Sequence, residues 1–182
     1  MNLRERKLNI IKILKNDGVG VMPTDTLYGL VGSVFSKKAI NRIYKIKKRS
    51  KKKKFIILIS SINDLKKFGI NLPLPRGSVR RTRGSDVLEI LKKFWPGKVS
   101  IVLNNIAFRL PKNKKLLNIL KQTGPLIAPS ANPEGLKPAE NITQAKKYFG
   151  DKVDFYLSGG TLKSKPSTLI KIENNGKIKK LR

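Results

Sequence analysis

The sequence predicts an α/β domain in which helices flank a twisted, mixed β-sheet. Two observations support this fold class. Strand-like and helix-like segments alternate irregularly along the chain, without the strict β-α-β order of a purely parallel sheet. The hydrophobic fraction of 39% is enough for a real core in 182 residues. This length suits one domain, and no segment resembles a long linker, so we assign residues 1–182 to a single domain.

Helical segments are indicated by apolar spacing and by residues that begin or end helices. Apolar residues from Leu3 to Leu14 share one helical face, and Gly18 ends the pattern. Ser36, Ser61 and Asn141 each precede a helix-like segment and can cap it. The first expected helix begins at Leu3, the second follows Ser36 and carries Ala39, Ile40 and Ile43 toward the core, and a third follows Ser61. Further helices are expected at residues 86–94, 112–122 and 142–149.

Strand-like segments are short, apolar and bounded by turn residues. The continuous apolar run at 55–59 is typical of a strand that is buried on both faces. The expected strands cover residues 19–22, 55–59, 99–103, 106–110, 126–128, 153–157, 168–172 and 177–181. Residues 69–85 hold prolines, glycines and four arginines, which predicts a mobile basic loop.

Charge and composition narrow the possible chemistry. Lys and Arg number 41 against 11 Asp and Glu, a formal charge of +30 that attracts polyanions such as RNA or nucleotides. A general bias toward lysine explains the same excess, so charge alone identifies no partner. The chain has neither Cys nor His, which excludes disulfides, thiolate metal sites and histidine bases. No apolar run is long enough for a membrane span and no signal peptide is visible, so we expect a cytoplasmic protein without membrane contact.

Three segments concentrate polar groups beside apolar strands. Residues 23–30 (Pro-Thr-Asp-Thr-Leu-Tyr-Gly-Leu) follow the first strand and offer two hydroxyls, although an ordinary polar turn would look similar. Residues 126–135 run from a strand into Pro-Ser-Ala-Asn-Pro, where Ser130 and Asn132 can face one ligand; a plain strand-to-helix turn is the alternative.

The third segment, residues 45–54, is strongly basic and leads into the apolar run at 55–59. Lysine runs are commonly solvated surface. However, a basic loop entering a buried strand is expected at a sheet edge, where ligands bind. In an extended segment Lys47 and Arg49 would point to the same side and could clamp a triphosphate. The usual GxxxxGK[ST] and GxGxxG nucleotide motifs are absent.

Together these segments resemble the YrdC-like family of threonylcarbamoyl-adenylate synthases, in order and in spacing. The resemblance extends over nearly the whole chain. Its motifs are residues 23–30, the Lys-x-Arg of 47–49 with the following strand, Trp-Pro-Gly at 95–97, Arg-x-Pro at 109–111, Ser-Ala-Asn at 130–132, Gly-Gly at 159–160 and Pro-Ser-Thr at 166–168.

The resemblance implies a YrdC-like fold with a basic concave face, and a reaction that joins L-threonine, bicarbonate or CO2 and ATP, releasing pyrophosphate. The product, threonylcarbamoyl-AMP, would feed threonylcarbamoyladenosine modification of tRNA through a downstream transferase complex. The resemblance places Lys47 and Arg49 as catalytic ATP contacts. It adds Lys53, Ser100, Ser130 and Asn132 as further ATP contacts, and Thr26, Arg109 and Ser167 as threonine contacts. No protein metal site is implied, and Mg²⁺ would arrive bound to ATP.

Departures from the family pattern are also visible. Asp25 replaces a common Glu, Glu134 replaces a common Ser near the expected phosphates, and Pro138 replaces a hydroxyl residue. Two other functions fit the sequence. One is a non-catalytic module that binds double-stranded RNA or tRNA; the other is a related carbamoyl-adenylate module, which normally lies inside a longer protein with zinc-finger-like segments.

Overall fold

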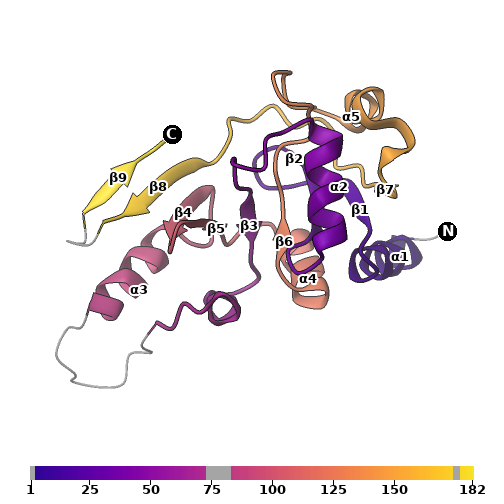
Figure 1. Cartoon of the computed structure of the whole chain (residues 1–182). Coiled ribbons are helices and arrows are strands. Elements are labelled where there is room, and N and C mark those ends of the chain that lie inside the picture. Colours follow the sequence, from indigo (N-terminus) through magenta and orange to yellow (C-terminus); the bar gives the residue numbers. More distant parts are fainter. Residues whose placement is uncertain (1–2, 73–82, 174–176) are drawn as a thin grey trace.

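A computed structural model describes residues 3–72, 83–173 and 177–182. Within these ranges helices and strands are arranged around one sheet (Figure 1). The helices are α1 Leu3–Lys15, α2 Lys37–Lys47, α3 Arg83–Phe94, α4 Lys114–Thr123 and α5 Ile142–Phe149, with 3-10 helices η1 Ile62–Phe68 and η2 Gly150–Lys152. The strands are β1 Val19–Pro23, β2 Tyr28–Ser33, β3 Ile56–Leu58, β4 Val99–Leu103, β5 Ile106–Arg109, β6 Leu126–Ile127, β7 Phe155–Tyr156, β8 Thr168–Ile172 and β9 Ile178–Lys180.

The nine strands of the described residues form a single mixed sheet in the order β7-β1-β2-β6-β3-β5-β4-β8-β9. The pairs β1–β7, β3–β5 and β4–β8 are parallel, and the other neighbouring pairs are antiparallel. This confirms the predicted α/β class. The predicted bounds of the strands at 99–103 and 168–172 agree with β4 and β8.

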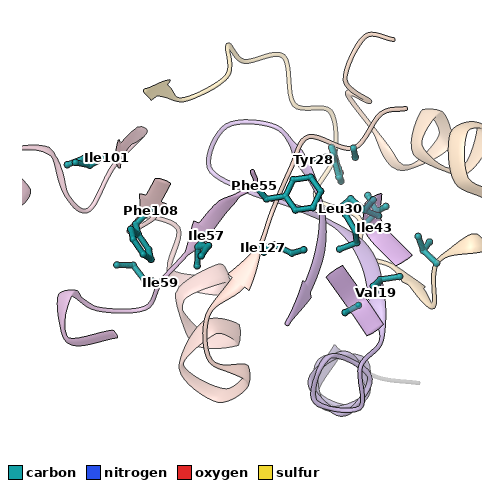
Figure 2. Close-up of a cluster of buried hydrophobic side chains, with 14 of the residues drawn as sticks. Val19, Tyr28, Leu30, Ile43, Phe55, Ile57, Ile59, Ile101, Phe108 and Ile127 are labelled. Carbon is teal, nitrogen blue, oxygen red and sulfur yellow. The ribbon is translucent and has the colours of Figure 1, made fainter. Parts of the chain in front are cut away.

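Hydrophobic side chains cover both faces of the sheet, because alternate residues of a strand point to opposite faces. On β3, Ile57 belongs to the cluster that includes α2 and α5, whereas Leu58 belongs to the cluster formed with α1 and α4. The first cluster is shown in Figure 2, where Val19, Leu30 and Ile43 lie among its members. Burial on both faces explains why the run at 55–59 is continuously apolar.

Polar side chains begin several helices as expected. Ser36 accepts a hydrogen bond from the amide of Ala39 at the start of α2, and Asn141 accepts one from Gln144 at the start of α5. The segment after Ser61 is also helical, but it forms the 3-10 helix η1, in which the Asp64 carboxylate accepts bonds from the amides of Ser60 and Ser61. None of the helices in the described ranges is long and apolar enough to cross a membrane.

Two expectations about local structure were wrong or incomplete. Strand β2 was not predicted, because residues 23–30 read as a polar turn; the turn is confined to residues 24–27 and the strand begins at Tyr28. The basic loop was expected at a sheet edge, but it precedes β3, the central strand of the order given above. The predicted mobile loop at 69–85 lies mostly outside the described residues.

Candidate active site

A cavity of about 230 Å³ lies where the ends of several strands meet. Its wall is rich in cations and hydroxyls. The charged lining residues are Arg49, Lys54, Arg109 and Arg182, and the hydroxyl-bearing ones include Thr24, Thr26, Ser130 and Ser167. Among the described residues, no carboxylate side chain lines this cavity. The cavity is therefore suited to an anionic ligand.

Arg109, at the end of β5, is the buried cation of this wall. Its side chain is 4% exposed. Nη1 donates to the hydroxyl of Thr26 at 3.1 Å and Nη2 donates to that of Thr24 at 3.3 Å. Asp25 Oδ1 lies 3.1 Å from Nη2 and balances the charge. Burial lowers the pKa of Arg109, Asp25 raises it and Arg182 lowers it further. The guanidinium is fixed by the turn between β1 and β2.

This turn is closed by the Thr24 hydroxyl. It donates to the carbonyl of Leu27 at 2.7 Å and accepts from the amides of Thr26 and Leu27 at 3.2 and 3.3 Å. The backbone amide of Thr24 also donates to the Leu27 carbonyl at 3.0 Å. These bonds among Thr24, Thr26 and Leu27 hold the Thr26 hydroxyl in a fixed place against Arg109.

The Ser-Ala-Asn segment continues β6 and lies beside β2. The amide of Leu30 donates to the carbonyl of Pro129 at 2.9 Å, and the amide of Ala131 donates to that of Tyr28 at 2.8 Å. Ser130 Oγ donates to Asn132 Oδ1 at 2.7 Å. The two side chains therefore lie together, as predicted, but only Ser130 lines the cavity.

Lys47 lies behind that segment. It is the last residue of α2, its side chain is 2% exposed, and its Nζ donates to the backbone carbonyls of Ser130 and Asn132. The pKa of Lys47 is lowered to about 8, chiefly by burial and also by repulsion from Arg49, while Glu134 opposes the shift. The charge lies within the wall of the cavity.

The expectation that Lys47 and Arg49 share an extended segment was wrong. Helix α2 continues to Lys47, and Lys48 adopts a left-handed conformation with φ of 51°. Arg49 consequently leaves the helix in another direction. Its guanidinium lies over the ring of Phe55, 5.6 Å from the centroid, and it lines the cavity. The helix end separates the two cations, so Lys47 approaches the Ser130 segment from beneath while Arg49 lies on the cavity wall.

Lys53 pairs with Glu134 at the rim. Lys53 Nζ donates to Glu134 Oε1 at 2.5 Å, and the Lys53 side chain is 60% exposed. The hydrogen bond from Lys53 is the main cause that holds the pKa of Glu134 below its usual range. The Glu134 amide donates to the carbonyl of Lys47 at 2.8 Å, which joins the end of α2 to the Ser-Ala-Asn segment.

Ser167 completes the wall from the other end of the sheet. Its Oγ lies 2.9 Å from Oγ of Ser100, which is fully buried on β4 and is absent from the cavity lining. Arg182 Nη2 donates to the Ser167 carbonyl at 3.1 Å and lies 3.4 Å from its hydroxyl. Ser100 thus supports Ser167 rather than facing the cavity itself.

The structure sorts the predicted site residues into two groups. Thr26, Arg49, Arg109, Ser130 and Ser167 line one cavity although they come from five distant segments. The other four lie away from the lining described above: Lys47, Asn132 and Ser100 behind it, and Lys53 at the rim.

Sequence reasoning missed several residues of the wall. Asp25 was noted only as a departure from a family pattern, and it is the counterion of Arg109. Thr24 was mentioned but not assigned a role, although its alternation with Thr26 was a usable signal. Lys54 belonged to the basic segment 45–54 but was not singled out, and Arg182 gave no local signal because its place depends on the pairing of β8 with β9.

Fold and cavity define an α/β domain with a cationic, hydroxyl-lined site for an anionic ligand. The Sua5/YciO/YrdC family model, described as telomere recombination, matches residues 12–182. The chain is 31% identical over 181 residues to a Methanocaldococcus jannaschii protein, covering 96% of this chain and 86% of that one. This chain belongs to the Sua5/YciO/YrdC family.

Two further comparisons describe its relatives. A protein of Marinobacter nauticus named threonylcarbamoyl-AMP synthase is 28% identical over 172 residues, which cover 85% of each chain. The crystal structure of Pyrococcus abyssi Sua5 complexed with L-threonine has a TM-score of 0.78 at 22% identity, covering 94% of this chain. This chain spans 52% of the length of that Sua5 chain, so the match shows the fold of the shared part.

Proposed function

We propose that this protein is a threonylcarbamoyl-AMP synthase. It joins L-threonine, bicarbonate or CO2 and ATP into L-threonylcarbamoyladenylate and releases pyrophosphate. The proposal rests mainly on the side chains that surround the Arg109 guanidinium. A buried guanidinium, fixed by Thr24, Thr26 and Asp25, shares one cavity with Arg49, Ser130 and Ser167. Such a site can hold the carboxylate of an amino acid next to a nucleotide phosphate.

The threonine end of the cavity is proposed to be the Arg109 end. The guanidinium would bind the threonine carboxylate, while the hydroxyls of Thr26 and Ser167 orient the rest of the amino acid. Arg109 is suited to this because its planar fork remains charged even when buried. The Marinobacter nauticus relative is named threonylcarbamoyl-AMP synthase, which supports threonine as the substrate.

The ATP end is proposed to be the Arg49 and Ser130 end. Arg49 contacts the phosphates from the cavity wall, and Lys47 adds positive charge from directly beneath the Ser130–Asn132 segment. Ser130 contacts the nucleotide, whereas Asn132 and Ser100 act by holding Ser130 and Ser167 in place. Lys53 reaches the phosphates only when it leaves Glu134.

The chemistry proceeds in two steps. The neutral threonine amine attacks the carbon of CO2 and releases a proton to solvent, or attacks the carbon of bicarbonate with loss of water, and either route gives a carbamate. A carbamate oxygen then attacks the α-phosphorus of ATP, the bond to the β-phosphate oxygen breaks, and pyrophosphate leaves. Positioned cations stabilise the charge that develops on the phosphates, so catalysis depends on electrostatics and orientation. No histidine is needed, because pyrophosphate leaves without protonation once cations neutralise it.

Mg²⁺ is proposed to arrive with ATP. In the described ranges no three carboxylate, histidine or cysteine side chains gather to hold a metal ion. Glu134 is paired with Lys53 and Asp25 is paired with Arg109. The donor set therefore fits an ion held by phosphate oxygens and water.

The wider setting of the reaction is also a proposal. The product would pass to a threonylcarbamoyl transferase that modifies tRNA in the cytoplasm, and exposed lysines such as Lys45, Lys51 and Lys52 could contact that tRNA. Such binding should weaken steeply as salt concentration rises.

Pyrophosphate release by the purified protein tests the function. We expect release from ATP only when L-threonine and bicarbonate are both present. Release without threonine would instead indicate other carbamoyl chemistry. No release under any condition, together with tight and salt-sensitive tRNA binding, would indicate a binding module.

A further inference from the structure

A single segment carries Ser167 across the sheet to the cavity. Residues 157–167, here called the strap, connect β7 at one end of the sheet with β8 near the other end. Figure 1 shows this connection passing from β7 to β8. The strap contains neither helix nor strand, so its course depends on contacts with other parts of the molecule.

Tyr28 holds the beginning of the strap. The Tyr28 side chain is fully buried at the start of β2. Its hydroxyl accepts a hydrogen bond from the amide of Gly159 at 2.8 Å and donates one to the carbonyl of Gly160 at 2.7 Å. One side chain thus satisfies a backbone donor and a backbone acceptor that are 131 and 132 residues away in the sequence.

The two glycines fit this contact. A Cβ at Gly159 would lie 2.7 and 2.8 Å from carbons of the Pro23 ring, closer than real Cβ atoms come. Gly160 has φ of +77°, a conformation that favours glycine. The Gly-Gly pair therefore lets the strap approach Tyr28 and the end of β1.

The contact joins two walls of the cavity. Tyr28 follows Thr26 by two residues and itself lines the cavity, as does Ser167 at the far end of the strap. Between them, the amide of Leu162 donates to the carbonyl of Glu140 at 2.7 Å. Ser167 is then fixed laterally by Ser100 and Arg182.

We infer that the Tyr28 hydroxyl is a positioning group that anchors the strap on Gly159 and Gly160, so that Ser167 faces Thr26 and Arg109 across the threonine site. This inference rests on the proposed function. Tyr28 does not react; it sets the distance between two walls that both contact the amino acid. Its loss should weaken threonine binding more than it slows turnover.

Tyr28→Phe tests the anchor, because it keeps the buried ring and removes only the hydroxyl. Hydrogen–deuterium exchange should become about tenfold faster, or more, in peptides from residues 157–167, since the Gly159 amide and the Gly160 carbonyl lose their shared partner. The KM for threonine in the pyrophosphate assay should rise about tenfold, while kcat changes by less than about threefold. Gly159→Ala should give the same pattern by pushing the strap away from Pro23.

Tyr156→Phe is the matched control. Its hydroxyl also donates to a glycine carbonyl, that of Gly150, at 2.7 Å, but Tyr156 is absent from the cavity lining. This variant should leave exchange in residues 157–167 and the KM for threonine unchanged.

The inference would be contradicted if hydrogen–deuterium exchange of residues 157–167 were unchanged in both Tyr28→Phe and Gly159→Ala. It would also be contradicted if kcat fell while the KM for threonine stayed constant. If one variant unfolds, which its melting curve reveals, the other decides. If the wild-type protein shows no threonine-dependent release of pyrophosphate, that result contradicts the proposed function instead. The exchange comparison, repeated with and without L-threonine, would then decide the positioning claim by itself: protection of 157–167 supports it, and no protection contradicts it.

Discussion

The ammonium of Lys47 donates hydrogen bonds to the backbone carbonyls of Ser130 and Asn132, the latter 85 residues away in the sequence. A third acceptor, Asn132 Oδ1, lies 3.4 Å from the same nitrogen. This relationship ties the end of α2 to the Ser-Ala-Asn segment. It places a positive charge immediately behind the wall where we propose that the ATP phosphates bind.

Lys47→Met removes this charge but keeps an apolar stem of similar length. We expect adenylate formation to slow on the order of 100-fold, the loss associated with removal of one preorganised charge-stabilising group. Steady-state pyrophosphate release measures the effect. Lys45→Met is the control, because Lys45 is exposed on the same helix and absent from the cavity lining. Near-normal turnover in Lys47→Met would remove Lys47 from its proposed role.

The binding of ATP should depend on pH through Lys47. Its pKa of about 8 lies below the ordinary lysine value of 10.5, chiefly because of burial. The ammonium is therefore charged at pH 7 and loses its proton as the pH rises through about 8. ATP affinity, measured by calorimetry without threonine, should weaken severalfold between roughly pH 7 and 9. Lys47→Arg should show a flat profile, and an equally steep one would assign the titration to another group.

The same shift has a consequence for stability. Between pH about 8 and 10.5 the unfolded chain binds more protons at Lys47 than the folded chain does. The contribution of this residue to the free energy of unfolding should therefore increase with pH across that window. Denaturant titrations at a series of pH values give the free energy of unfolding of the wild type and of Lys47→Met. The slope of this free energy against pH should be larger for the wild type, and the difference between the two slopes measures the contribution of Lys47.

Arg109→Lys should weaken threonine binding. A lysine keeps the charge but cannot contact Thr24, Thr26 and a ligand carboxylate at once, because it lacks the planar fork. We expect the KM for threonine to rise on the order of 10- to 100-fold. The matched control is Arg42→Lys, since Arg42 pairs with both oxygens of Asp154 away from the cavity lining. A larger KM effect in Arg42→Lys than in Arg109→Lys would contradict the assignment.

Glu134→Gln should strengthen ATP binding. The substitution removes a negative charge from the rim and frees Lys53 from its ion pair. We expect the KM for ATP to fall about two- to fourfold, the size of one unscreened repulsion at several ångströms in water. Glu89→Gln serves as the control, because Glu89 forms a similar exposed pair with Lys92 on α3. A higher KM for ATP in Glu134→Gln would contradict this expectation and would mean that Glu134 contributes to ATP binding.

Regular elements were predictable where local patterns determine them. Val99–Leu103 and Thr168–Ile172 show strand-like apolar runs between turn residues, and both match the observed bounds. Tyr28–Ser33 was missed because its two glycines and serine lower strand propensity. That strand is stabilised by pairing with β1 and β6, which no local pattern reveals.

The site was predictable in its parts but not in its assembly. Thr26, Arg109 and Ser167 could be named from motifs, and the structure brings them to one cavity. The directions in which the Lys47 and Arg49 side chains point could not be predicted, because helix α2 extends further than the lysine-rich sequence suggested. Arg182 reaches the cavity only through the antiparallel pairing of β8 and β9, a contact that spacing cannot show.

The most direct test of the central claim is the origin of the carbonyl carbon in the product. The protein is incubated with ATP, L-threonine and carbon-13 bicarbonate, and the adenylate is analysed by mass spectrometry. We expect a threonylcarbamoyl-adenylate that carries one carbon-13 and appears together with pyrophosphate. An adenylate without the label, or no adenylate while ATP and threonine remain intact, would contradict it.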